Sequence, residues 1–494
     1  MKQGKRSKKI VLLLTLISVF VLMGNAQTSL IYYHTKDQFN SSNYNPAFLT
    51  ATQKFTFSIF PLAGMSVGYN NQEVILDVMT RTLSGDQTNE DFKDIFNSLV
   101  AQELFFLNYE TNLLHLGYNS EVGSFNFRIK ENVLLATDFK GELSDFLMSP
   151  TFSTLAIGRS QLFAAEALHY REYSMGFARE LIRNKLTVGL RAKLYLGKSI
   201  LLSDVSGVMR PNGNTYSLQI EGPMKLSIPA NPTLRDDVIE DLNLAKDFDI
   251  VDYITNTSNF GTGLDLGFTY KVTPEIELSA SVTDWGRINW NKNINTLIFN
   301  DEFLVPEGNI EIELNEQGVP VITKIIDKPI SDSINFSLII DETPFNSVLP
   351  TTFFAGLKYQ LNPKFNVGIV ERYIRTKGLN HNSISLSANY QANKKFTILT
   401  GYSIIGNSYR NVPLALLYKW DGGQTFFGTD NLLSFLFPSS SEFSGITFGT
   451  CFYLFRDKVK YKDPLDYRPF FRPKKLKERN KKGLIFNNYK ESKS

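Results

Sequence analysis

The chain has 494 residues, of which 43% are hydrophobic, 20% charged and 13% aromatic, so wholesale disorder is excluded. A lone cysteine and four widely separated histidines exclude an internal disulfide and a paired metal-ligand motif, and we expect no metal and no cofactor. The net charge of +3 hides an acidic body, residues 27–455, in which 44 acidic residues outnumber 33 basic ones, and this balance argues against nucleic acid as a partner.

Residues 1–26 have the three parts of a secretory signal peptide. Five basic residues precede an apolar run at residues 10–23, which is shorter than the roughly 20 residues that a membrane-spanning helix needs. Gly24 and Ala26 then place small residues at the positions that a signal peptidase reads before Gln27. An uncleaved anchor is the alternative. We expect a cleavable signal peptide and an exported mature chain.

From residue 54 onward, apolar and polar residues alternate, as in β-strands with one apolar face. The expected strands are about 8–11 residues long, many end in an aromatic residue, and short polar turns alternate with long polar stretches. A soluble β protein also alternates, but these details favour a membrane barrel, since an open sheet in lipid leaves backbone groups unpaired. We predict an all-β fold, a transmembrane antiparallel β-barrel of about 14 strands over residues 54–455.

The alternation also assigns residues to the two faces of the barrel wall. In the strand at residues 185–196, Leu190 is expected to face lipid and Arg191 the lumen. Residues 54–70 are interpreted as a hairpin, followed by short helices at 74–83 and 88–100 in a loop outside the barrel. Fourteen strands are expected near residues 54–60, 63–70, 112–119, 123–130, 170–179, 185–196, 215–221, 262–271, 275–285, 351–360, 364–374, 383–391, 395–405 and 444–455. Further strand-like pieces at 333–340, 411–420 and 424–429 leave even counts from 12 to 16 open.

Several segments resemble known outer-membrane proteins. Residues 43–48, with the sequence NYNPAF, resemble the Asn-Pro-Ala segment of FadL-like and PorP/SprF-like barrels. Residues 170–179, 185–193, 261–267 and 349–359 resemble an uncharacterised outer-membrane family, a domain of unknown function, from bacteria with type IX secretion. The resemblance covers roughly residues 30–455. It departs from the usual barrel pattern at the C-terminus, where 39 residues follow Phe455.

The resemblance implies location and architecture, because the family has no agreed activity. In FadL-like proteins the N-terminal segment forms a hatch inside a 14-stranded barrel. Residues 27–53 are therefore expected to be a lumen or hatch segment, with Asn45, Pro46 and Ala47 inside the barrel.

Charged residues in the lumen phase of the strands form a second candidate site. The cations come from two early strands and the carboxylates from a later hairpin: Arg128, Lys130, Arg191, Lys193, Asp265 and Glu277. They are interpreted as interior ion pairs that close a narrow barrel. The alternative is that they select which solutes pass.

Catalytic motifs are not found, and we expect the protein not to be an enzyme. His115 and His169 lie on or near strands, so a hydrolase triad on the barrel surface is retained only as an alternative to interfacial or lumen histidines. Cys451 is interpreted as a small lumen residue and not as a reactive thiol.

Residues 456–494 form a basic tail with 14 basic and 5 acidic residues. An even-stranded barrel places both termini in the periplasm, so we expect the tail there. It is interpreted either as a solvated extension or as a docking arm for a periplasmic protein or an anionic cell-wall polymer. The residues expected to bind the partner are Phe470, Phe471, Arg472, Lys474, Lys475 and Lys477.

These observations predict an outer-membrane barrel in contact with outer-membrane lipid. Its expected function is that of a FadL/PorP-like conduit for small apolar molecules or an accessory of surface protein export. The alternative is a non-transporting anchor that docks a periplasmic partner through its basic tail. A lateral gap in the wall beside an apolar pocket would favour transport, and a lumen filled by side chains would favour the anchor.

Overall fold

The computed structural model describes most of the chain between residues 30 and 454. The described residues are 30–36, 38–48, 53–70, 104–120, 122–139, 158–212, 215–228, 230–235, 238–244, 250–306, 310–314, 320–325, 339–375, 380–406, 408–437, 441 and 443–454. The expected signal peptide, the helices at 74–83 and 88–100, and the basic tail lie outside them.

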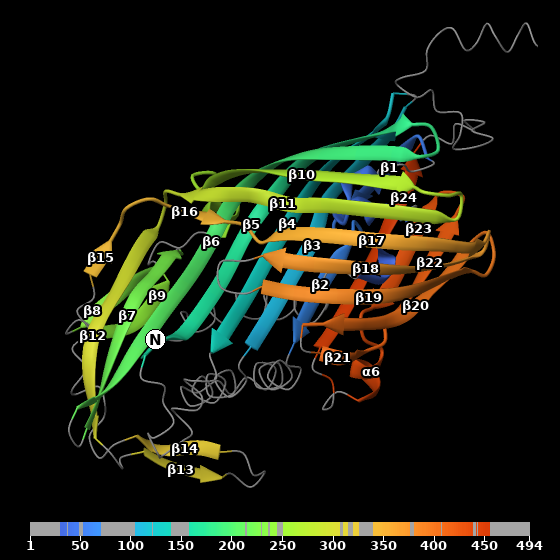
Figure 1. The fold of residues 1–494 in the computed structure, drawn as a ribbon. Coiled ribbons are helices and arrows are strands. Elements are labelled where there is room, and N and C mark those ends of the chain that lie inside the picture. Colours follow the sequence, from blue (N-terminus) through green and yellow to red (C-terminus); the bar gives the residue numbers. More distant parts are fainter. Residues whose placement is uncertain are drawn as a thin grey trace, which may run out of the picture.

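A closed antiparallel barrel forms the body of the molecule (Figure 1). Each strand pairs with its neighbour, and the last strand returns to pair with the first. Fourteen strand positions make up the ring over the described residues: β1 (Phe55–Ile59) with β2 (Met65–Asn70), β3 (Leu104–Asn119), β4 (Ser124–Phe139), β5 (Gly158–Ile182), β6 (Leu186–Asn212), β10 (Phe260–Lys271), β11 (Ile276–Trp290), β17 (Thr351–Asn362), β18 (Phe365–Arg375), β19 (Asn380–Gln391), β20 (Phe396–Ile405), β22 (Leu414–Trp420), β23 (Gly423–Thr429) and β24 (Phe443–Leu454). The predicted fold class and strand number are confirmed.

The strand assignment differs from the prediction at three places. The proposed 54–70 hairpin is wrong, because β1 and β2 do not pair with each other: both pair with β3 on one side and β24 on the other. They are two halves of one strand, interrupted at residues 60–64. Pro61 and Gly64 are typical turn residues, but the chain does not reverse there: β2 continues in the direction of β1, between the same two neighbouring strands.

The pairing of β1 and β2 with β24 shows how many extra residues the interruption contains. Phe57 is paired with Phe452, and Met65 with Phe448, so eight steps along β1 and β2 face four steps along β24. Backbone groups of the interruption still bond to the wall on both sides, since the Phe60 amide donates to Leu113 and the Leu62 carbonyl accepts from Thr450. The wall is therefore bent but hydrogen-bonded at this point.

The expected strand at 215–221 is β7 (Thr215–Ser227), which lies outside the ring. It pairs with the C-terminal half of β6, residues 200–212. The strands β12 (Ile294–Pro306) and β15 (Ile339–Asp341) extend this sheet beyond the barrel rim (Figure 1). Conversely, the pieces at 411–420 and 424–429 supply β22 and β23 of the ring itself. The remaining described strands are β16 (Phe345–Val348), β21 (Ser408–Asn411), the hairpin of β8 (Ala230–Arg235) and β9 (Val238–Leu244), and the hairpin of β13 (Ile310–Leu314) and β14 (Pro320–Ile325).

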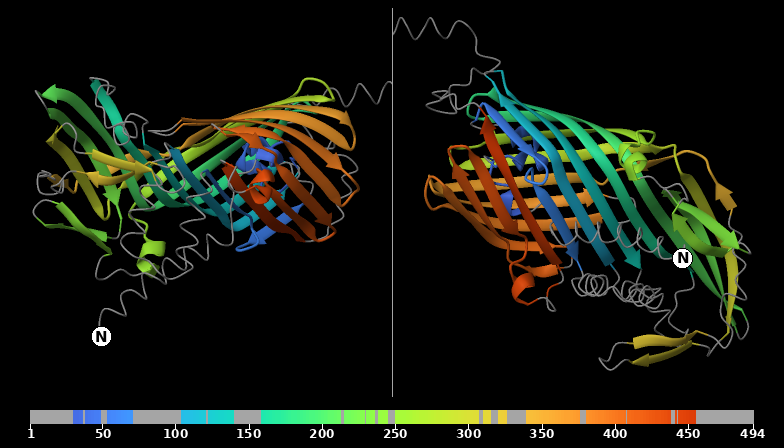
Figure 2. Two further views of the ribbon diagram at one scale, coloured as in Figure 1. Left: turned by 90° about the horizontal axis from the view of Figure 1, so that it is seen from below. Right: turned by 180° about the vertical axis from the view of Figure 1, so that it is seen from behind.

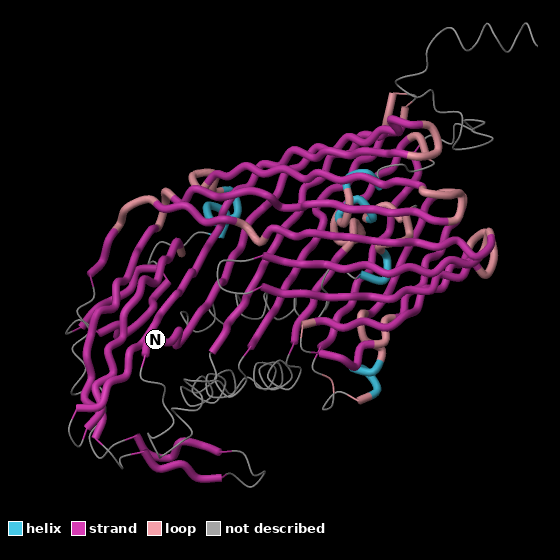
Figure 3. Tube along the Cα trace, viewed as in Figure 1, coloured by secondary structure: helices cyan, strands magenta, loops and turns pink. Residues whose placement is uncertain are grey.

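Helices are short wherever the chain is described. Three 3-10 turns precede the barrel in sequence and lie inside it (Figure 3): η1 (Leu30–Tyr32), η2 (Ser41–Asn43) and η3 (Pro46–Phe48). Two others lie in connections, α5 (Ile250–Thr255) and α6 (Leu433–Leu436). No described helix has the length and apolarity to cross a membrane.

The outer and inner faces of the wall differ in polarity, as the alternation predicts. Leu190 is 47% exposed on the outer face, whereas the next residue, Arg191, is 2% exposed inside. Exposed aromatic residues gather at two levels of the outer face. One level, near the short turns, includes Tyr118, Phe125, Tyr270, Tyr359, Tyr390 and Phe396, and the other includes Phe353, Tyr373, Trp285, Tyr402 and Tyr409. An apolar outer face with two aromatic levels matches the surface that lipid requires of a barrel.

Candidate functional site

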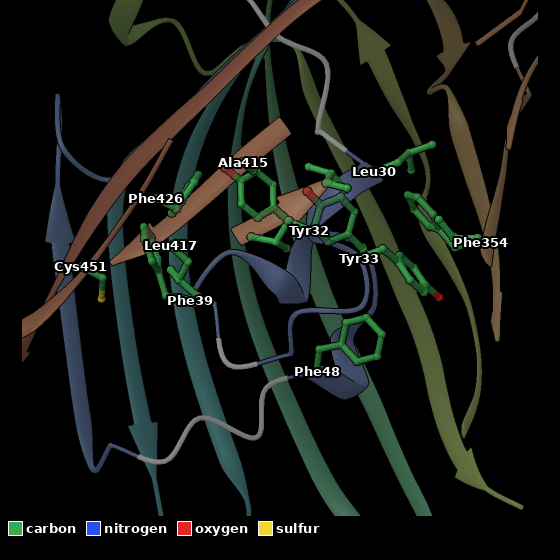
Figure 4. Close-up of a cluster of buried hydrophobic side chains, with 14 residues drawn as sticks. Leu30, Tyr32, Tyr33, Phe39, Phe48, Phe354, Ala415, Leu417, Phe426 and Cys451 are labelled. Atoms are coloured by element: carbon green, nitrogen blue, oxygen red, sulfur yellow. The ribbon is translucent and has the colours of Figure 1, made fainter. Parts of the chain in front are cut away.

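The lumen is occupied by residues 30–48, which we call the hatch. Figure 2 shows this N-terminal segment enclosed by the ring of strands. The hatch contributes half of a buried cluster whose other members belong to the wall (Figure 4): Leu30, Ile31, Tyr32, Tyr33, Phe39, Tyr44, Phe48, Phe354, Val370, Leu399, Ala415, Leu417, Phe426 and Cys451. The ring of Tyr32 packs edge-on against Phe426 with centroids 5.1 Å apart, and Tyr33 stacks on Phe354 at 5.7 Å. Aromatic contacts of this kind fix the hatch to opposite parts of the wall.

Glycines of the wall make room for the hatch, six of them among the described residues: Gly64, Gly189, Gly267, Gly356, Gly368 and Gly428. Gly189 on β6 and Gly267 on β10 are paired across the two strands, and both face Pro46 and its neighbours. A Cβ at Gly189 would lie 2.2 Å from the Pro46 carbonyl carbon, and one at Gly267 would lie 2.0 Å from Asn45 Oδ1. Gly356 and Gly368 meet Tyr33 and His34 in the same way. Only glycine at these positions permits such close approach.

Asn45 connects the hatch to two neighbouring strands. Its side-chain Nδ2 donates to the backbone carbonyls of Phe268 on β10 and Ala280 on β11, at 3.1 Å each. Its Oδ1 accepts from the Ala47 amide at 2.9 Å, which closes the turn at Pro46. The predicted lumen residues Asn45, Pro46 and Ala47 therefore all lie in the interior, and Asn45 is fully buried.

A network of buried charges lies beside the hatch. Arg191 Nη1 contacts Asp265 at 3.0 Å, and Lys193 Nζ contacts Asp265 at 3.0 Å, Asp284 at 2.8 Å and Glu172 at 3.3 Å. Lys130 contacts Glu110 at 3.2 Å. Arg191 also reaches the hatch, because its Nη2 donates to the Ser42 carbonyl at 2.7 Å.

The network brings together four of the six predicted lumen charges and separates the other two. Glu277 lies apart and pairs with Lys36 of the hatch at 2.6 Å. Arg128 is buried but has no carboxylate within 4 Å among the described residues.

Three carboxylates of the network were absent from the sequence prediction. Glu172 lies in the lumen phase of a predicted strand, so its alternation with Ser174 could have revealed it. Glu110 was missed because the predicted strand starts at residue 112, whereas β3 starts at Leu104 in the structure. Asp284 is out of phase: a register shift between β10 and β11, with a positive φ of 59° at Asp284, turns it inward.

Two cavities lie between the hatch and the wall and are lined by described residues. The first, of about 80 Å³, lies between apolar side chains such as Phe106, Leu134 and Phe354 and polar ones such as Tyr170 and Asp284. The second, of about 20 Å³, is lined by Gly64, Met65 and Ser66 at the interruption of the first strand. Both cavities share Asn43, Glu110 and Lys130 as lining residues. A separate apolar hollow of about 830 Å³ lies on the outer wall, around Leu190, Leu266 and Phe353.

The interruption is closed from inside by the hatch. Asn112 Nδ2 donates to the Ala63 carbonyl at 3.0 Å and to Asn40 Oδ1 of the hatch at 3.4 Å. A Cβ at Gly64, whose φ is +106°, would lie 2.3 Å from Asn40 Nδ2. Asn40 therefore packs directly behind the bend in the wall.

The two candidate histidines lie in different environments. His115 is buried in the lumen beside Phe39, with ring centroids 5.3 Å apart. His169 lies outside, where its Nε2 contacts Glu131 at 2.8 Å and its Nδ1 contacts the Tyr253 hydroxyl at 2.7 Å. Groups of three or more His, Cys, Asp or Glu side chains able to hold a metal are absent from the described part of the chain.

The chain was compared with known proteins at the levels of structure and sequence. Among solved structures, it is similar to a mutant of the monoaromatic hydrocarbon channel TodX (TM-score 0.38, 11% identity, covering 84% of this chain and 93% of that one). It is also similar to the P. putida toluene transporter TodX (0.36, 11%, 84% and 93%) and the CymD monoaromatic hydrocarbon channel (0.34, 10%, 84% and 91%). No curated protein matches its sequence. Residues 46–430 match a family profile described as a family of unknown function, DUF5723, and the chain belongs to that family.

Proposed function

We propose that the protein is an outer-membrane conduit for small apolar molecules, and that the hatch gates it. The main support for this proposal is the arrangement of the lumen. A single N-terminal segment closes it through specific contacts, and one small cavity lies between that segment and the interrupted strand of the wall.

The outer surface supports the membrane location. The exposed outer face carries large apolar side chains, and its aromatic residues gather at two levels. In water, so extensive an apolar surface would favour aggregation, whereas in lipid it is the required surface. The closed ring satisfies the backbone groups of the wall, as a hydrocarbon environment demands.

The hatch contacts support gating over permanent closure. Asn45 reaches the wall through two hydrogen bonds, Arg191 holds Ser42, and Lys36 pairs with Glu277. Each is a non-covalent contact of modest net strength, roughly 0.5–3 kcal/mol. Displacing the hatch near Asn40 would join the two cavities to the bend at Ala63 and Gly64.

The cavity lining offers a passenger both apolar and polar contacts. Phe106, Leu134, Phe354 and Ile374 form its apolar part, and the charged residues Glu110, Lys130, Asp284 and Arg372 lie among its polar ones. A chamber of about 80 Å³ suits a molecule no larger than a single small ring when the hatch is closed.

The test is uptake of an apolar fluorescent probe, N-phenyl-1-naphthylamine, by intact Gram-negative cells that express the full chain. Because this probe is larger than the closed chamber, it passes only when the hatch moves aside, so we expect uptake above the vector control with the full chain and much faster uptake with a variant that lacks residues 30–48. Cells with equal amounts of heat-modifiable barrel but vector-level uptake in both cases would refute the conduit.

A non-transporting role is the second candidate, favoured by the filled lumen. The hatch and the charge network fill much of the described lumen, and the two cavities described between the hatch and the wall are small. In an anchor for a periplasmic partner, or in an accessory of surface export, the hatch would stabilise the barrel and nothing would pass. Removing residues 30–48 would then lower barrel stability without a change in probe uptake while the barrel remains folded.

A further inference from the structure

Arg128 is a buried cation that the ion pairs of the lumen do not use. It is 2% exposed, and its Nε and Nη2 have no hydrogen-bond partner among the described residues. Leaving a charged donor buried and unpaired is costly. The four carboxylates nearby lie within 4 Å of other cations, Lys130, Lys193 or Arg191, although Glu172 Oε2 accepts no hydrogen bond among the described residues: Glu110, Glu172, Asp265 and Asp284.

Two further donors face the same stretch of the wall. Ser174 on β5 is paired directly with Arg128 on β4, and its hydroxyl has no partner in the described structure. On the other side of β5, Gly176 is paired with Arg191 of β6. Arg191 Nε is also unpartnered, although its two terminal nitrogens bind Asp265 and Ser42. Cross-strand and diagonal neighbours lie within reach of long side chains.

Arg128 differs from the other lumen cations in what surrounds it. The 80 Å³ cavity is lined by the carboxylates Glu110 and Asp284 together with the cations Lys130 and Arg372, so its charges balance. Arg128 lies nearer the short turn at residues 120–123, and its strand neighbour on that side is the uncharged Asn126. Arg128 is therefore a lumen cation that no carboxylate within 4 Å balances among the described residues.

We propose that Arg128, Ser174 and Arg191 form a binding site for a small monovalent inorganic anion of chloride size. The anion accepts from the two guanidinium groups and from the serine hydroxyl. A halide suits this set, because it needs only a few donors from any direction, whereas a phosphate brings four oxygens and up to two charges.

The site also touches the hatch. Arg191 donates to the Ser42 carbonyl, and Asn126 Nδ2 donates to Ser42 Oγ at 3.3 Å. An anion between Arg128 and Arg191 would screen their mutual repulsion and hold Arg191 in the position that binds Ser42. The site stands independently of the proposed transport function.

The test uses the full-length protein, folded in detergent, and follows the loss of the unboiled gel form with temperature. Sodium chloride or bromide is compared with sodium methanesulfonate at equal concentration. We expect the halides to raise the midpoint by about 1–2 °C at ten times the Kd, for a chain of this size. Crystals grown in bromide should show an anomalous peak beside the Arg128 guanidinium.

Variants separate the site from a general salt effect. Arg128→Gln should lose the halide shift, and Ser174→Ala should weaken it, which keeps the test valid if Arg128→Gln misfolds. Arg287→Gln, at an exposed position of β11, should keep the full shift. Equal midpoints of the wild-type protein in both salts, or an unchanged halide shift in the Arg128 and Ser174 variants, would overturn the proposal.

Discussion

Substituting Gly267 by alanine should release the hatch without opening the barrel wall. The new Cβ would lie 2.0 Å from Asn45 Oδ1 and 2.9 Å from Pro46 Cδ, which are distances that no side chain tolerates. The wall backbone at this point is held on both sides by β6 and β11, so the hatch is the part that moves.

The expected magnitude follows from the contacts of Asn45. Displacing its side chain breaks two hydrogen bonds of 3.1 Å to Phe268 and Ala280. At a net 0.5–1.5 kcal/mol for each bond, hatch docking weakens by about 1–3 kcal/mol. The population of the undocked hatch should therefore rise by about 5- to 150-fold.

Tryptic cleavage after Lys36 provides the assay. This residue belongs to the hatch, and its ammonium group is engaged by Glu277 when the hatch is docked. Cleavage of the folded, unboiled protein should accelerate with the undocked population, as mass spectrometry of the released fragment would measure. The matched control is Gly422→Ala, whose Cβ would have its nearest neighbour, Trp420 Nε1, at 3.2 Å in a short turn. Equal cleavage of the wild type and Gly267→Ala would refute the hatch argument.

Three other outcomes are expected. Because the ring is closed, the extracted protein should migrate differently on a gel before and after boiling; identical migration together with recovery from the soluble periplasm would contradict the barrel in lipid. Leu190→Arg should impair assembly at a cost of about 2–4 kcal/mol if this exposed position lies at mid-membrane, whereas Arg191→Leu should assemble and loosen the hatch; the reverse would invert the two faces. Deleting residues 457–494 should leave the barrel heat-modifiable but remove salt-sensitive periplasmic partners, and failure to assemble would instead assign the tail to barrel biogenesis.

The predicted strand number agrees with the structure because two added strands cancel two omitted ones. Counting residues 54–60 and 63–70 as separate strands added one position, and placing 215–221 in the ring added another. Leaving 411–420 and 424–429 as uncertain pieces removed two. Alternation identifies strands, but pairing partners depend on long-range register. No local pattern distinguishes a hairpin from a strand that bends and resumes.

The positions of the lumen charges were likewise predictable only where the alternation along a strand is regular. Arg191, Lys193 and Asp265 alternate correctly with outward residues, so their shared interior was readable from sequence. The inward position of Asp284 was not readable from the sequence, because a bulge between β10 and β11 turns its side chain from the outer face of the wall to the lumen. The ion pair of Lys36 was not readable either, because its partner Glu277 is 241 positions away and the hatch sequence has no periodic pattern.

The glycines explain how a polar, irregular segment can be held inside the barrel. The turn at residues 43–48 cannot pair as a strand, so its backbone needs partners from the wall. Gly189 and Gly267 bring the wall close enough for Asn45 to bond to the carbonyls of β10 and β11, which the ring itself leaves with a free lone pair. A wall with larger side chains would hold the hatch away from those carbonyls, and buried amides would go unsatisfied. Gly189 and Gly267 thus make room for the hatch, and substituting them by alanine is the most direct way to separate closure of the lumen from stability of the fold.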